Sequence, residues 1–98
     1  MNLIAVSTLR SFWERHPQSE NGLRLLARMI QSGRWEGPQD FKSAFGRNVD
    51  FVAGNRVIID VGGNKYRVVL AVSYSTSRAF VKFVGTHAEY DRIDAGSV

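Results

Sequence analysis

The feature that most constrains the fold is the side-chain alternation between Arg56 and Asp91, in RVIIDVGGNKYRVVLAVSYSTSRAFVKFVGTHAEYD. Three runs rich in Val, Ile, Phe and Tyr are separated by two short connections rich in Gly or Ser, which is the pattern of consecutive strands. A two-residue loop at Gly62-Gly63 or at Gly63-Asn64 would join the first two strands. The chain is therefore expected to fold around an antiparallel sheet.

The same alternation assigns side chains to the two faces of that sheet, because neighbouring side chains on a strand point to opposite faces. The face predicted to be apolar carries Val57, Ile59, Val61, Tyr66, Val68, Leu70, Val72 and Tyr74. The face predicted to be basic carries Arg56, Asp60, Lys65 and Arg67. A two- or four-residue loop within residues 75–78 adds Lys82 to the basic face and turns Val81 and Phe83 to the apolar one. A three-residue loop would bury Lys82, which argues against it.

The N-terminal part predicts a short strand and two helices. Residues 2–6, NLIAV, are long enough for a strand and too short for a helix. Ser7 is the expected N-cap of a first helix that ends at Pro17, and Ser19 or Asn21 opens a second helix that ends at Gly33 in a C′ position. The residues at helical spacing are Leu9, Phe12, Trp13 and His16 in the first helix, and Leu23, Leu26, Ala27 and Ile30 in the second.

Two further segments lie between the helices and the strands. Residues 39–45 predict a short helix with Phe41 and Phe45 packed inward and Lys42 pointing toward solvent or a partner. Residues 46–54, GRNVDFVAG, fit a strand or an extended connection. Helices followed by consecutive strands indicate an α+β fold, with two N-terminal helices packed on an antiparallel sheet of about four strands and a short C-terminal helix.

Length and composition limit the classes of protein that fit. A chain of 98 residues is expected to form one domain, residues 1–98. Its net charge of +4 makes nucleic acid, an anionic surface or an acidic protein plausible partners. The chain has no cysteine, and its start lacks the basic and then apolar pattern of a signal peptide, so a cytoplasmic location is expected.

Residues 86–89, Thr-His-Ala-Glu, form a capping-box motif that starts the last helix. It places His87 in the first turn, with Tyr90 and Asp91 on nearly the same side. The assumed register pairs Thr86 with Arg67, so a guanidinium, a titratable imidazole and a phenol are expected to share one surface.

That grouping suits RNA cleavage without a metal ion, in which a 2′-hydroxyl attacks the neighbouring phosphate. Arg67 would stabilise the phosphorane because a guanidinium matches its oxygens in a bidentate way. His87 would act as general acid or base, and Tyr90 would position the base or ribose. Each residue also has a purely structural reading: Asp60 pairing across the hairpin, His87 as a helix-start residue, Tyr90 as packing and His16 as a helix cap.

Three segments together look familiar: VSTLRSFWERHPQSE, GNRVIIDVGGNKYRVVLAVSY and FVKFVGTHAEYD. They resemble the HigB-type toxins of bacterial type II toxin–antitoxin systems, a branch of the RelE-like fold. The resemblance covers nearly the whole chain, and its most specific parts are GNKYR and VGTHAEYD. The family pattern carries over onto Asn55, Arg56, Asn64, Lys65, Tyr66, Arg67, Thr86, His87, Glu89, Tyr90 and Asp91.

The resemblance implies an endoribonuclease, an mRNA interferase that cuts messages on the translating ribosome and is neutralised by a HigA-type antitoxin with a helix-turn-helix domain. DNA would then be contacted only through the antitoxin, and no membrane, metal or other cofactor is expected. The expected catalytic residues are Arg67, His87 and Tyr90, and the expected RNA-binding residues are Lys42, Arg56, Asn64, Lys65 and Lys82. The alternative is a non-catalytic basic adaptor that binds RNA or an acidic protein through the same face.

Overall fold

The computed structural model describes residues 1–98 and contains one five-stranded sheet in the order β1-β5-β4-β3-β2. The strands are β1 (Asn2–Ile4), β2 (Val49–Val52), β3 (Arg56–Val61), β4 (Tyr66–Ser73) and β5 (Arg78–Thr86). All neighbouring strands are antiparallel except β1, which runs parallel to β5. The predicted α+β fold is confirmed. Residues 2–4 and 49–52, which the sequence left as short or ambiguous segments, become the two edge strands.

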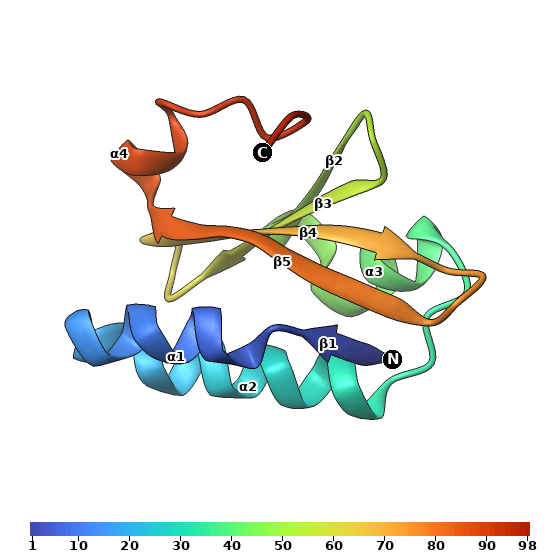
Figure 1. The fold of residues 1–98 in the computed structure, drawn as a ribbon, viewed down its shortest axis with the longest axis horizontal. Helices are drawn as coiled ribbons and strands as arrows, with labels where there is room; N and C mark the ends of the chain where they lie inside the picture. The colour runs from blue at the N-terminus through green and yellow to red at the C-terminus, as the bar shows by residue number, and fades with distance from the viewer.

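The helices are α1 (Val6–Arg15), α2 (Glu20–Ser32), α3 (Pro38–Phe45) and the one-turn α4 (His87–Tyr90). Helices α1 and α2 lie side by side against one face of the sheet (Figure 1). The predicted stripes are confirmed: Leu9, Phe12, Trp13, Leu23, Leu26, Ala27 and Ile30 are all buried there. None of the helices has the length and apolar character needed to cross a membrane.

The predicted helix ends need correction at two positions. The N-cap of α1 is Ala5, which offers no side-chain hydrogen bond, and Ser7 lies inside the helix. Ala5 is the only residue between β1 and α1, so the N-cap position falls on a side chain that cannot accept a hydrogen bond. Gly33 ends α2 with φ −83°, an extended conformation, in place of the left-handed C′ geometry that glycine often adopts.

The turn between β3 and β4 has the register that a Gly63-Asn64 loop predicts. Val61 lies opposite Tyr66, Asp60 lies opposite Arg67, and the Lys65 amide donates to the Gly62 carbonyl at 3.4 Å. Both central residues have positive φ, 64° for Gly63 and 77° for Asn64, as a tight hairpin turn requires. The predicted apolar face of β3 and β4 is therefore correct, and it packs on the helices.

A β-bulge in β5 changes the predicted register near the site. Leu70 pairs with Val81 and Val69 pairs with Phe83, so Lys82 is an extra residue without a partner on β4. Beyond the bulge, Arg67 lies opposite Gly85, and Thr86 lies opposite Tyr66. The predicted pairing of Thr86 with Arg67 is therefore wrong by one residue.

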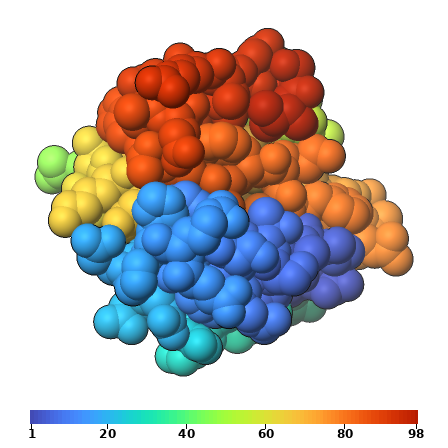
Figure 2. All heavy atoms as spheres, turned by 60° about the vertical axis from the view of Figure 1, so that its left-hand side comes forward, coloured from blue at the N-terminus to red at the C-terminus, as the bar shows by residue number.

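The predicted basic face is also apolar at its centre. Ile58, Val69 and Ala95 form a second buried cluster, against which Phe83, Tyr90, Ile93 and Val98 pack. The prediction for Phe83 is thus wrong, because the bulge turns its ring away from the helices. Figure 2 shows the C-terminal segment as a separate layer over the strands, on the side opposite α1 and α2. The charged side chains that the sequence assigned to this face are consequently separated by an apolar patch.

Candidate active site

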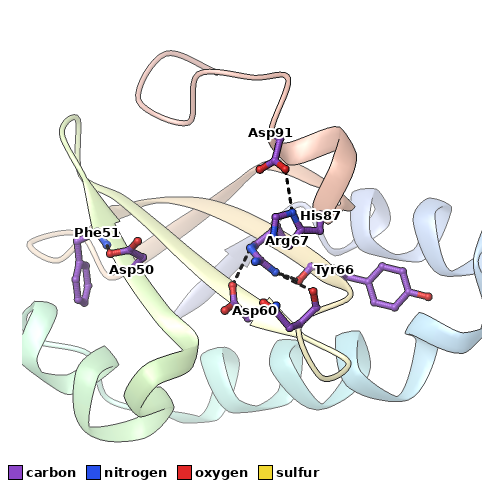
Figure 3. Close-up of polar contacts among 8 residues, drawn as sticks. Asp50, Phe51, Asp60, Tyr66, Arg67, His87 and Asp91 are labelled. Atoms are coloured by element: carbon purple, nitrogen blue, oxygen red, sulfur yellow. Dashed lines mark hydrogen bonds and ion pairs between the residues drawn. The ribbon is translucent and has the colours of Figure 1, made fainter.

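Arg67 is the centre of the polar cluster at one end of the sheet (Figure 3). Only 9% of its surface is exposed, and its Nε forms an ion pair with Asp60 Oδ1 at 3.0 Å across the β3–β4 pair. Its Nη1 donates to the carbonyls of Asn64 at 3.2 Å and Tyr66 at 3.4 Å. Nη2 has no partner in the protein and is open to solvent. The guanidinium is therefore held on two sides and free on the third.

A hollow of about 470 Å³ lies in front of Arg67. The residues that line it are Lys42, Arg47, Val49, Asp50, Ile58, Asp60, Arg67 and Tyr90. The two cations other than Arg67 come from α3 and the 3₁₀ turn Gly46–Asn48 that follows it, and Lys42 Nζ is steadied by the Gly46 carbonyl at 3.2 Å. With the carboxylates of Asp50 and Asp60 counted, the three cations leave the lining with a net charge of +1, which suits a phosphate group.

Tyr90 forms the apolar wall of this hollow. Its ring centroid lies 5.9 Å from Arg67 Cζ and 6.4 Å from the Phe83 ring. Burial raises the pKa of the Tyr90 phenol, the carboxylate of Asp50 raises it further, and Arg67 partly opposes the shift. The phenol therefore keeps its proton at neutral pH and can donate a hydrogen bond to an anion.

His87 does not line the hollow; it starts α4, whose last residue Tyr90 does, and this start of α4 is termed the rim. The capping box is present as predicted, with Thr86 Oγ1 accepting from the Glu89 amide at 3.2 Å and Glu89 Oε1 accepting from the Thr86 amide at 2.8 Å. The His87 amide donates to the Lys65 carbonyl at 3.0 Å, and this bond fixes α4 to the start of β4. On the imidazole, Nδ1 lies 3.1 Å from Asp91 Oδ2 (Figure 3). Asp91 thus orients a half-exposed ring and leaves Nε2 unpaired.

Comparison with known proteins identifies the family to which these residues belong. Residues 19–93 match the HigB toxin family, described as the RelE-like toxic component of a toxin-antitoxin system. The chain belongs to the HigB family. It is 30% identical to the mRNA interferase HigB of Escherichia coli O6:H1 over 95% of this chain and 91% of that protein. It is 32% identical to the mRNA interferase toxin HigB of Escherichia coli K12, over 93% of this chain and 88% of that protein.

In this HigB-family chain, the structure brings together only part of the predicted site. Arg67, Tyr90 and Lys42 share the hollow, and His87 stands at its rim. Asn64 supplies its carbonyl to Arg67 and lies at the turn next to the hollow. Lys65 is an exposed turn residue. Its carbonyl accepts the hydrogen bond from the His87 amide, so Lys65, like Asn64, stabilises the local structure through its backbone.

Two predicted RNA-binding residues lie outside the hollow. Arg56 sits at the other end of β3, where Nη1 donates to the Gly54 carbonyl at 2.8 Å and Nη2 donates to the Val98 carbonyl at 2.7 Å. It therefore anchors the C-terminal segment of this HigB toxin. Lys82 is exposed at the bulge and does not line the hollow.

Arg47 and Asp50 line the hollow and were missed by the sequence analysis. Both belong to residues 46–54, where a strand and an extended connection fitted equally well, so no face was assigned to them. The feature that could have indicated Arg47 was the charge pattern, because Arg47 follows Lys42 by five residues, across the end of α3. Within the HigB chain, no three His, Cys, Asp or Glu side chains are grouped so that they could hold a metal ion.

Proposed function

We propose that this HigB-family toxin is an mRNA interferase whose cleavage site is the hollow in front of Arg67. One observation carries the proposal: a nearly buried guanidinium is held by Asp60 and two carbonyls, its Nη2 has no partner in the protein, and the residue lines a hollow that Lys42 and Arg47 also line. Such a fixed cation stabilises developing negative charge at little reorganisation cost. Its membership of a family whose relatives are named mRNA interferases supports the same conclusion.

In the proposed reaction the scissile phosphate occupies the hollow. The 2′-hydroxyl attacks phosphorus, the 5′-oxygen leaves with a proton, and the products are a 2′,3′-cyclic phosphate and a 5′-hydroxyl. Arg67 Nη2 and the Tyr90 phenol donate to the non-bridging oxygens as charge grows on them, and Lys42 and Arg47 hold the neighbouring phosphates.

Proton transfer is assigned to His87, as the sequence analysis predicted. With Nδ1 directed at Asp91, Nε2 is the nitrogen that takes a proton from the 2′-hydroxyl or gives one to the 5′-oxygen. This step requires the substrate to reach from the hollow to the rim of α4, where His87 stands. No step of the proposed reaction uses a metal ion or another cofactor.

The proposed partners follow from the family. The substrate is mRNA on the translating ribosome in the cytoplasm, and the proposed antagonist is a HigA-type antitoxin that contacts DNA through its helix-turn-helix domain. A protein of this kind should arrest growth when it is induced alone and should be tolerated when the antitoxin is induced with it.

The test is the chemistry of the RNA ends that the purified protein makes in a translating extract. We expect cyclic or 3′-phosphate ends from the parent, none from Arg67→Ala, and parental cutting from Arg78→Ala, a control arginine that is exposed at the far end of β5. Products with 3′-hydroxyl ends would rule out attack by the 2′-hydroxyl.

The alternative function, a basic adaptor that binds RNA or an acidic protein without cutting, remains the one to exclude. It predicts that the parent binds RNA or an acidic protein and that neither the parent nor Arg67→Ala produces new RNA ends. It also predicts that induction leaves growth unchanged, because a passive binder does not destroy messages.

A further inference from the structure

A second hollow adjoins the Arg67 hollow and is built entirely from polar and glycine residues. It measures about 500 Å³ and is lined by Arg47, Asn48, Asp60, Gly62, Gly63 and Asn64. Two residues, Arg47 and Asp60, line both hollows, so the two spaces share a wall. We propose that this second hollow is a nucleobase subsite, which binds the base of a nucleotide next to the cleaved phosphate and prefers a base with an exocyclic amino group over uracil.

The charge and the hydrogen-bonding groups of the lining suit a base better than another phosphate. Its cation, Arg47, is matched by the carboxylate of Asp60, so the lining has no net positive charge. Two asparagine amides add both donors and acceptors, which is the chemistry of base edges and not of phosphate oxygens. This inference rests on the proposed function only for the neighbouring position of the cleaved phosphate.

The preference among bases follows from Asp60. Its Oδ1 is occupied by Arg67 Nε at 3.0 Å, whereas Oδ2 has no hydrogen-bond partner in the protein. An ionised carboxylate only accepts hydrogen bonds. Adenine, guanine and cytosine each offer an amino group to such an acceptor, but uracil carries carbonyl oxygens at the corresponding positions. Uracil offers a carboxylate only its N3–H, which lies between two carbonyl oxygens, so it lacks the amino donor and brings an acceptor close to the carboxylate.

The turn that lines the second hollow is suited to the test, because the side chain of Asn64 can be removed without disturbing the backbone. Asn64 has φ 77°, so Asn64→Gly keeps this conformation available and also keeps the carbonyl that Arg67 uses. Asn48→Ala removes the second amide from an exposed position at the end of the 3₁₀ turn. Asn2→Ala is the matched control, since Asn2 is exposed on β1 and pairs with Arg78 at the opposite end of the sheet.

The experiment is an NMR titration of the whole protein with the four nucleoside 5′-monophosphates and with ribose 5-phosphate, which needs no cleavage. We expect the amides of Asn48, Gly63 and Asn64 to shift with AMP, GMP or CMP at millimolar concentration, and UMP to bind at least about fivefold more weakly than the best of them. Asn64→Gly and Asn48→Ala should remove this difference, and Asn2→Ala should keep it.

Several results would overturn the subsite: UMP binding as tightly as the other three, ribose 5-phosphate producing the same shifts at these amides, or no shift at them with any nucleotide. Sequencing of cut ends supplies a second readout, because the ends that the two variants produce should lose the bias against uridine at one position beside the cut. A protein that distinguishes the bases in the titration but never cuts RNA would refute the proposed function and leave the subsite standing.

Discussion

Replacing Asp60 by alanine should weaken both the fold and the catalytic site, because it removes the partner of a nearly buried guanidinium. The side chains of Arg67 and Asp60 are 10% and 23% exposed, and their Nε–Oδ1 distance is 3.0 Å. The Asn64 and Tyr66 carbonyls would still accept from Nη1, but nothing would hold Nε. The charge of Arg67 would remain in the protein without a counter-ion.

The size of the effect follows from the geometry. At 3.0 Å and an effective dielectric constant of roughly 20, the gross attraction is about 5 kcal/mol, most of which offsets the cost of removing both groups from water. The net contribution of a hydrogen bond between charged groups is about 1.5 to 3 kcal/mol. A loss of about 2 kcal/mol lowers the Tm of a domain of this size by roughly 8 to 16 °C.

The assay compares thermal melts and RNA cleavage for Asp60→Ala, Asp60→Asn and the double variant with Arg67→Ala. Asp60→Asn keeps an acceptor oxygen and should lose less stability. The double variant should be more stable than the sum of the single changes predicts, by about 1 to 2 kcal/mol, because it leaves no unpaired charge. Cleavage by Asp60→Ala should fall about tenfold or more as Arg67 loses its orientation. An Asp60→Ala protein that melts and cuts like the parent would refute the reasoning.

Three further predictions concern the cap, the rim and the C-terminal anchor. The hydrogen bond from the Thr86 amide holds the pKa of Glu89 below its usual range. The stability that this carboxylate contributes is therefore present above about pH 4.3 and is lost as the pH falls through the lower folded pKa. The Tm of Glu89→Gln should lie below that of the parent near neutrality and converge with it in acid. His87→Gln should reduce cleavage by about 100-fold or more at an unchanged Tm, and normal cutting would transfer the proton-carrying role to another group. Arg56→Ala should lower the Tm, because it frees the C-terminal segment, and should leave the salt dependence of RNA binding unchanged. A slope of the log binding constant against log salt concentration that is smaller by about 0.7 to 0.9 would instead show that Arg56 contacts a phosphate.

The parts of the fold that could be predicted from the sequence are those set by local periodicity. The alternation from Val57 to Leu70 fixed the two faces of β3 and β4, while the register was left between a Gly62-Gly63 and a Gly63-Asn64 turn, and the structure has the second. The bulge at Lys82 could not be predicted, because one extra residue leaves no trace in the alternation of a strand where both faces are partly apolar. Ile58 and Val69 likewise gave no sign that the C-terminal segment would cover them.

The candidate site divides in the same way. Arg67 and Asp60 face each other because they are direct cross-strand neighbours, and that pairing was among the sequence-based alternatives. Arg47 reaches the hollow through the path of the chain between α3 and β2, which is set by packing of the whole domain. Arg56 was assigned to RNA by its face and by the family resemblance, and its contact with Val98 depends on a segment that is distant in sequence.

The extra residue in β5 turns Val81 and Phe83 to opposite faces of the sheet, which two residues at this spacing in a regular strand could not do. Many side chains at position 82 should be tolerated, because Lys82 is exposed and has no partner on β4. Deleting the residue should also be absorbed, because the pairs Leu70–Val81 and Val69–Phe83 would then be consecutive in a regular ladder, with Phe83 still turned away from the helices and α4 in place relative to Arg67. A codon lost between Phe83 and Thr86 would instead shift the start of α4 by one position relative to Arg67, while every catalytic side chain remained in the sequence.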